Sequence, residues 1–273
     1  MNESFNRVID QCCGTLKLDF SSAELAQLAL ANGFSPETLD GMVTLFEYLR
    51  VKKEQTTIQT ILRMSRLPQK VPKTFDNFDF GVLRAKGLAD MEKLLAIRTL
   101  APVYAHKNLA FIGPAGTGKT HLAQAFGYEC CRNGLKTYFI KASELLDKFT
   151  TARRAEKTAA MLTSLVRPSC LIIDEIGHCE FDKENTRLFF DLIDRRYNKE
   201  GAYNIVFTSN RNPSLWRENF SDEDSLLCAL DRIFDDATVF NIHGDSFRGK
   251  RLETYALQRP ARHLPWAPER LRN

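Results

Sequence analysis

Hydrophobic residues in the first part of the chain recur with helical spacing. Ser21 and Glu24 match a capping box, in which the serine hydroxyl accepts a hydrogen bond from the glutamate amide and the glutamate carboxylate reaches back. This signal predicts a helix over residues 23–31. Gly33 is suited to end it, because glycine readily adopts the left-handed backbone conformation found after helix ends.

A second helix is expected to begin after Ser35, whose hydroxyl can cap it, with Pro36 in its first position. Its apolar side chains recur at helical intervals and form one face: Leu39, Met42, Val43, Phe46 and Leu49. A further helical pattern runs from about residue 56 to residue 67 and ends before Pro68. The segment from Gln69 to Thr74 contains Pro72 and is typical of a linker. We therefore expect a helical domain over 1–68, a larger domain over 69–258 and a basic tail over 259–273.

Helical and strand patterns alternate after the linker. The apolar runs that predict strands are residues 108–112, 137–140, 170–174, 204–209 and 237–242. The helical patterns between them cover residues 119–133, 143–165 and 183–199. Strands that are apolar on both faces and alternate with helices are typical of parallel sheets covered on both sides. The sequence therefore predicts an α/β fold with a five-stranded parallel sheet, preceded by a small all-helical domain.

Composition places the chain among ordinary globular proteins, with 44% hydrophobic and 26% charged residues over 273 positions. No apolar run approaches the roughly eighteen residues that a membrane helix needs, and the N-terminus lacks a signal pattern, so a cytoplasmic protein without membrane contact is expected. The seven cysteines include two adjacent pairs, Cys12/Cys13 and Cys130/Cys131. Such spacing suits reduced, mostly buried thiols better than zinc ligands.

The net charge of +4 alone does not indicate a polyanionic partner. Its distribution is more informative, since residues 248–273 hold seven arginines and lysines against Glu253 and Glu269. A basic tail of this kind suits phosphate backbones. The alternative is a solvated terminus that charge keeps soluble.

Residues 113–120 read GPAGTGKT and match the P-loop pattern G-x-x-x-x-G-K-[ST] in full, between a predicted strand and a predicted helix. The glycines let backbone amides turn towards phosphates, and the helix N-terminus adds a positive dipole end. The expected nucleotide contacts are Gly113, Pro114, Ala115, Gly116, Thr117, Gly118, Lys119, Thr120 and His121. Lys119 would reach the outer phosphates of ATP and Thr120 would bind Mg²⁺. The alternative is a glycine-rich turn without a ligand.

Two further strands end in polar residues that suit phosphate chemistry. Asp174 ends the strand predicted over residues 170–174, and Glu175 follows it. Asp174 would hold Mg²⁺ through water, and Glu175 would polarise the attacking water. An apolar strand that ends in acid is common by itself, so this assignment depends on the P-loop. Asn210 follows the next strand and could bond the attacking water or terminal phosphate, or simply satisfy a turn. Arg232 and Arg248 cannot be assigned from spacing alone.

With these residues in view, the chain resembles the IstB family, ATP-dependent helper proteins of insertion-sequence transposition. This family is related to the DnaC helicase loaders and DnaA initiators within the AAA+ ATPases. The resemblance runs from about Leu49 to Arg251. It rests on the order of several short motifs: residues 75–80 (FDNFDF), 118–123 (GKTHLA), 174–177 (DEIG), 208–210 (TSN), Trp216, 230–232 (LDR) and 244–248 (GDSFR). Residues 178–180 depart from the usual family sequence.

The resemblance implies roles that the residues alone left open. Arg232 matches the arginine finger that enters the neighbouring subunit's site, Arg248 matches the sensor-2 arginine, and Asn210 matches sensor 1. Asn77 and Phe78 lie where relatives form part of the adenine pocket. The helix predicted over 143–165 corresponds to a region that faces DNA in related assemblies. Its basic residues, and those of a second candidate patch in the helical domain, are Lys148, Arg153, Arg154, Lys157, Arg50, Lys52 and Lys53. Each of them could equally be a solvated surface residue.

The resemblance leads us to expect an ATPase that uses ATP and Mg²⁺. It would assemble as a homo-oligomer, with ATP at subunit interfaces, on double-stranded DNA of largely any sequence. The loaded complex would recruit and stimulate a partner transposase, and hydrolysis would drive disassembly. The alternatives are a DnaC-type helicase loader, which shares almost all these motifs, and a metabolic nucleotide kinase, which would need an acceptor pocket and no arginine from a neighbour.

Overall fold

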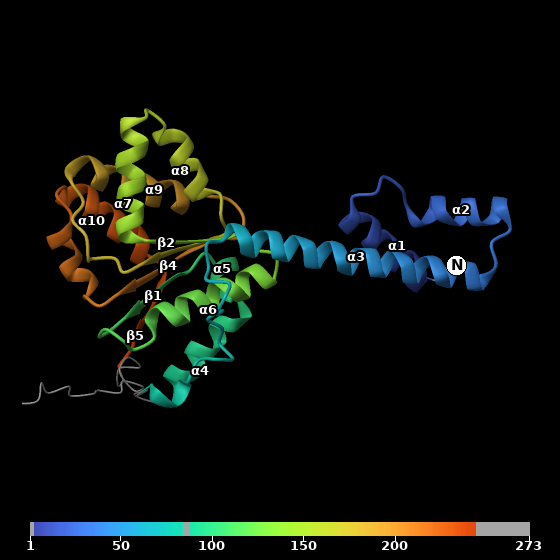
Figure 1. Ribbon diagram of the computed structural model, residues 1–273, viewed down its shortest axis with the longest axis horizontal. Coiled ribbons are helices and arrows are strands. Elements are labelled where there is room, and N and C mark those ends of the chain that lie inside the picture. The colour runs from blue at the N-terminus through green and yellow to red at the C-terminus, as the bar shows by residue number, and fades with distance from the viewer. Residues whose placement is uncertain (1–2, 84–87, 244–273) are drawn as a thin grey trace, which may run out of the picture.

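The computed structural model describes residues 3–83 and 88–243 of the chain (Figure 1). Its centre is one sheet formed by β1 (Asn108–Ile112), β2 (Thr137–Lys141), β3 (Cys170–Asp174), β4 (Asn204–Ser209) and β5 (Ala237–Asn241). The strands lie in the order β2-β3-β4-β1-β5, and all neighbours are parallel. The predicted α/β class and five-stranded parallel sheet are confirmed, and each predicted strand matches to within one residue at either end.

Both faces of the central strands β1, β3 and β4 are buried, as unbroken apolar strands predict. In β1, Ala110 and Ile112 join the core on one face, whereas Leu109 and Phe111 join the core on the other. Figure 1 shows helices on both sides of the sheet. The first face is covered by α7 (Ala142–Arg154), α8 (Thr158–Val166), α9 (Lys183–Tyr197), α10 (Glu223–Phe234) and the 3-10 segment η3 (Pro213–Asn219). The second is covered by η1 (Phe80–Val82), α4 (Leu88–Ala96), η2 (Ile97–Thr99), α5 (Ala101–Tyr104) and α6 (Lys119–Arg132).

The N-terminal helices α1 (Glu3–Leu16), α2 (Ser22–Asn32) and α3 (Pro36–Met64) form a separate small cluster at the outer end of α3 (Figure 1). The Ser21–Glu24 capping box, the left-handed Gly33 after α2 and the Ser35 cap with Pro36 in the first turn are all confirmed. The prediction of two helices between residues 35 and 67 is wrong, because α3 is continuous over 29 residues. Leu49 was expected on the buried face of this helix but is 40% exposed.

The inner end of α3 packs against the larger domain. Ile61 and Leu67 are buried in the same core as the second face of the sheet. The Phe139 amide in the edge strand β2 donates a 2.8 Å hydrogen bond to the Ser65 carbonyl. The proposed domain boundary after residue 68 therefore follows a helix end that is itself anchored in the larger domain.

The helix predicted over 143–165 shows the opposite error, because it is divided in the structure. It consists of α7 and α8, which are separated at Glu156, where the backbone adopts the left-handed conformation (φ 55°). The Lys157 amide bonds the Ala152 carbonyl at 2.8 Å, so the turn ends α7 as a glycine would.

All seven cysteines are free thiols. Across residues 3–83 and 88–243, no group of three or more His, Cys, Asp and Glu side chains is arranged to hold a metal ion. No helix within the same ranges has the length and apolar character needed to cross a bilayer.

Candidate nucleotide site

The P-loop lies between β1 and α6, as predicted, and its shape requires glycine. Gly116 and Gly118 have positive φ angles of 82° and 88°, which other residues adopt with strain. At Gly113 a Cβ atom would collide with the backbone carbonyl oxygen of Ile242, just beyond β5. The loop can therefore turn its amides inwards and lie against β5 only with glycine at these positions, which is the geometry that a phosphate cradle needs.

Two side chains of the loop bond its own backbone. The Lys119 ammonium donates a 2.7 Å hydrogen bond to the Pro114 carbonyl, and the Thr117 hydroxyl donates to the same oxygen at 2.9 Å. Both side chains are almost fully buried. Lys119 is therefore held within the turn of the loop, close to the amides that would surround the phosphates.

Asp174 joins three elements at one carboxylate oxygen. The Thr120 hydroxyl in the first turn of α6 donates to Asp174 Oδ1 at 2.8 Å, and the Thr208 hydroxyl in β4 donates to it at 2.6 Å. Asp174 is 1% exposed. Burial raises the pKa of Asp174 above its ordinary value, while the two hydroxyls oppose that rise. A buried carboxylate beside a hydroxyl offers the hard oxygen donors that Mg²⁺ prefers, so these residues fit the ion.

Glu175 follows directly and is held in an unusual backbone conformation. Its φ angle is 60°, which is uncommon for a residue with a side chain. Its amide donates to the Thr208 hydroxyl at 2.9 Å, and its carboxylate lies 3.4 Å from the Lys141 ammonium at the end of β2. Strained residues of this kind often occur at functional sites. Lys141 here holds the carboxylate that was predicted to polarise water.

Asn210 lies at the same edge of the sheet, in an exposed position immediately after β4. This strand runs between β3, which ends in Asp174, and β1, which leads into the P-loop. The Gly113 amide donates a 3.1 Å bond to the Ser209 carbonyl, so Asn210 begins directly beside the loop. The structure therefore brings Asn210, the P-loop, Asp174 and Glu175 together, as the sequence predicted.

The segment around Asn77 and Phe78 packs against the first turn of α6. His121 Nε2 lies 2.9 Å from both the Thr74 carbonyl and the Asn77 side-chain oxygen, and the Phe78 ring meets the imidazole edge-on at 5.0 Å. Two acceptors at Nε2 indicate that this nitrogen carries the proton. Burial lowers the pKa of His121, which favours the neutral ring. The expected adenine-pocket residues thus lie beside the P-loop helix.

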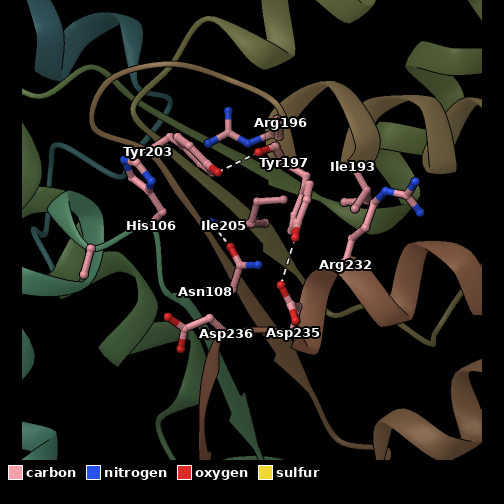
Figure 2. Close-up of a pocket in the computed structure, with 11 residues that line it drawn as sticks. His106, Asn108, Ile193, Arg196, Tyr197, Tyr203, Ile205, Arg232, Asp235 and Asp236 are labelled. Carbon is pink, nitrogen blue, oxygen red and sulfur yellow. Dashed lines mark hydrogen bonds between the residues drawn. The ribbon is translucent and has the colours of Figure 1, made fainter.

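Arg232 lies near the N-terminal ends of the strands, opposite the ends that carry the P-loop and Asp174. It lines a cavity of about 320 Å³ together with residues at the starts of strands, including Asn108, Ile205 and Asp236 (Figure 2). These positions mark the N-terminal ends of β1, β4 and β5, whereas the P-loop and Asp174 lie at the C-terminal ends. Arg232 is therefore separated from the nucleotide site of its own chain by the length of the strands. Arg248 lies outside the described residues.

Some of the candidate DNA-contact residues form ion pairs, hydrogen bonds or ring contacts within the described part of the chain, and others do not. Arg153 pairs with Asp182 at 3.3 Å and bonds Asn185, and Arg50 pairs with Glu54. Lys148 lies 6.0 Å from the centre of the Tyr138 ring, and Lys52 lies 5.6 Å from that of Tyr48. The exposed members of the set are Arg154, Lys157, Lys52 and Lys53.

Sequence reasoning did not assign the hydroxyl that links the two acidic residues. Thr208 accepts from the Glu175 amide and donates to Asp174, and Lys141 pairs with the Glu175 carboxylate. Thr208 belongs to the TSN motif at residues 208–210 but was given no role there, and Lys141 directly follows the strand predicted over 137–140. A hydroxyl or an ammonium at such a position is too common to single out.

The order of the strands, the P-loop after β1 and the acidic pair after β3 define a P-loop nucleotide-binding protein of the AAA+ type. The model of the IstB-like ATP binding protein family matches residues 14–254. The chain belongs to this family.

Curated relatives come from insertion sequences. The ATP-binding protein of insertion sequence IS5376 from Geobacillus stearothermophilus is 35% identical over 82% of this chain and 88% of its own length. That of insertion sequence IS232 from Bacillus thuringiensis is 34% identical over 78% and 82%, respectively.

Solved structures with the same fold are more distant in sequence. DnaA from Aquifex aeolicus with bound AMPPCP has a TM-score of 0.52 and 20% identity, over 65% of this chain and 51% of that chain. A DnaC helicase loader has a TM-score of 0.50 and 18% identity, over 63% and 97%. At such identities the likeness shows the fold alone.

Proposed function

We propose that this protein is an ATPase that regulates transposition by assembling on DNA with ATP bound between its subunits. The assembled complex recruits and stimulates a partner transposase, and ATP hydrolysis drives disassembly. The insertion-sequence origin of the 35% and 34% identical relatives supports the transposition context. The same names favour this function over a helicase loader, whose resemblance is limited to the fold.

Each residue of the site has a part in the proposed reaction. The P-loop amides and Lys119 bind the phosphates of ATP, and Asn77, Phe78 and His121 border the adenine. Thr120 and Asp174 would hold Mg²⁺, which would supply positive charge to neutralise the phosphates. Glu175 accepts the proton of the attacking water while Asn210 orients that water, and the bond between the γ-phosphorus and its bridging oxygen breaks to give ADP and phosphate.

The multi-subunit part of the proposal rests on the position of Arg232. This residue lies near the N-terminal ends of the strands, opposite the P-loop of its own chain. An arginine that offsets charge on the transferring phosphoryl group must lie within hydrogen-bonding distance of it. Arg232 can meet this condition only at the site of a neighbouring copy. We therefore infer that each complete site contains the P-loop of one subunit and Arg232 of the next.

DNA is expected to lie along the helices that follow β2. Arg154 ends α7 and Lys157 precedes α8, and both are exposed. Contacts from such residues to phosphates provide affinity without reading bases, which fits largely sequence-independent binding.

A mixing experiment tests the shared site. Lys119→Ala removes nucleotide binding but retains Arg232, whereas Arg232→Ala retains nucleotide binding but lacks the arginine. Each variant alone should lose DNA-stimulated ATP turnover, by about 1,000-fold or more for Arg232→Ala. Mixed in equal amounts, the two variants should regain a substantial part of it, because the Lys119→Ala subunit supplies Arg232 to its neighbour. A mixture that stays as inactive as its components would contradict the proposal.

A further inference from the structure

The Arg232 guanidinium is fixed by three contacts from two helices. Its Nε lies 2.9 Å from Asp194 Oδ1 on α9, and its Nη1 donates to the Cys228 carbonyl on α10 at 3.0 Å. Its central carbon lies 5.1 Å from the centre of the Phe190 ring, which comes one turn before Asp194 on α9. An arginine with so many anchors has little freedom to change its orientation.

The choice of Asp194 as partner is specific, because two acids closer in sequence are engaged elsewhere. Asp235 accepts a 2.9 Å hydrogen bond from the Tyr197 hydroxyl, and Asp236 pairs with Lys107 at 3.0 Å. In Figure 2 the Arg232 guanidinium lies on the side away from both of these carboxylates. Asp194 is thus the carboxylate that sets the direction of Arg232.

The contacts use the inner part of the guanidinium and leave its outer edge available. Nε and Nη1 are engaged by Asp194 and Cys228, while Nη2 makes no hydrogen bond within residues 3–83 and 88–243. A guanidinium presents its five donors in a fixed planar fork, so fixing two of its nitrogens determines where the third points. The side chain remains 30% exposed.

We propose that Asp194 is a positioning residue for the reaction in the neighbouring subunit, because it holds Arg232 with Nη2 directed out of its own chain. This inference rests on the proposed function of Arg232. Orienting a group before the reaction removes the need to order it in the transition state. An arginine with a free side chain would reach the neighbour's γ-phosphate in the correct geometry only part of the time. Asp194 therefore acts on a site that it does not touch.

The test uses mixed assemblies, so that the change lies in a subunit that cannot itself bind ATP. Lys119→Ala subunits serve as donors of Arg232, and Arg232→Ala subunits carry the ATP site that is measured. The donors are compared with and without Asp194→Asn. The matched control is Asp191→Asn, which lies one turn earlier on α9, has a side chain 38% exposed against 35% for Asp194, and pairs with Arg195.

The Asp194→Asn donor should lower the recovered kcat by about 10- to 100-fold, the effect of misplacing a group by about 1 Å. KM for ATP and the size of the complex on DNA should stay unchanged, and the Asp191→Asn donor should match the parent. An ion pair this exposed contributes little to stability, so thermal unfolding of the donor should also be unaltered. An Asp194→Glu donor should recover part of the lost kcat, because it retains the carboxylate.

The outcomes separate the two claims. If the parent donor fails to restore turnover, the shared site itself is wrong. If the parent donor succeeds and the Asp194→Asn donor is equally active, or more active because Asp194 restrains Arg232, the positioning role is wrong. If KM for ATP rises or the complex on DNA becomes smaller together with the fall in kcat, Asp194 has a role in assembly. That result would also overturn the positioning role.

Discussion

At the scale of single residues, the site depends on a carboxylate oxygen shared by two hydroxyls. Asp174 Oδ1 accepts hydrogen bonds from the Thr120 and Thr208 hydroxyls. Movement of α6 or of β4 would therefore change the contacts of this one oxygen. The Thr208 hydroxyl also accepts from the Glu175 amide. Thr208 therefore links the position of Glu175 to that of Asp174. Both residues should move together when nucleotide binds.

Glu175 provides the most direct residue-level prediction. Glu175→Gln removes the base and the charge paired with Lys141, but leaves the P-loop, Thr120 and Asp174 in place. ATP turnover should fall by about 100- to 10,000-fold, while ATP remains bound and the complex stays on DNA longer than the unaltered protein. Turnover assays and dissociation from labelled duplex measure both effects.

Glu184→Gln is a suitable control, because Glu184 is exposed on α9 and pairs with Arg187 outside the site. It should change neither turnover nor dissociation. A Glu175→Gln protein that leaves DNA sooner than the unaltered protein would count against ATP as the link that holds the assembly together.

Most of the site could be predicted at this scale, because the P-loop, Asp174, Glu175 and Asn210 each occupy a defined place after a strand. The pairing of Arg232 with Asp194 could not, since the two residues are 38 positions apart in the sequence and meet only in the folded chain. The same holds for Lys141, which ends β2, and Glu175, which follows the neighbouring strand β3. Periodicity indicates which face of an element a residue occupies, but it does not indicate which of several carboxylates forms an ion pair with a given arginine.

At the scale of elements, helix continuity was the least predictable property. Residues 50–55 are polar except for Val51 and separate the two helical patterns, yet they contain no proline or glycine and α3 continues through them. At Glu156 the opposite happens, since α7 ends without either residue. Its end is formed by the Glu156 and Lys157 amides, which bond carbonyls of the last turn. Backbone capping of this kind leaves no clear sequence signal.

The end of α7 is also where the DNA prediction can be tested. Replacing both Arg154 and Lys157 with glutamate should weaken duplex binding similarly for all sequences. If both residues contact phosphates, the slope of log affinity against log salt concentration should decrease by about 2 units. The measurement is a salt titration of binding with ATP present.

The matched control reverses the same amount of charge at Arg132 and Lys136, which are also exposed and belong to neither α7 nor α8. This control should have a smaller effect on both affinity and slope. If the two double variants behave alike, net charge rather than the α7–α8 region determines binding.

At the scale of the whole molecule, the two edges of one sheet have different parts in the proposed function. In the proposal, residues at the C-terminal ends of the strands bind and hydrolyse ATP, and Arg232, near the N-terminal ends, serves another copy. A single subunit therefore carries both halves of the site, too far apart to act on each other. Under the proposed function, assembly and catalysis are one process, and ATP acts as a link between subunits.

The helical N-terminal cluster is placed at a distance from this sheet by α3, whose inner end is anchored in the larger domain through Ile61 and Leu67 (Figure 1). The all-helical composition of this region was predictable from its caps and periodicity. Its separation from the sheet depended on the continuity of α3, which periodicity alone did not reveal.

The most direct test of the central claim is the size of the protein on duplex DNA, measured by sedimentation with ATP, with ADP and for Arg232→Ala with ATP. Large complexes of several subunits are expected with ATP, and smaller ones with ADP or without the arginine. A protein that stays equally small and off DNA in all three conditions would contradict an ATP site shared between subunits on DNA.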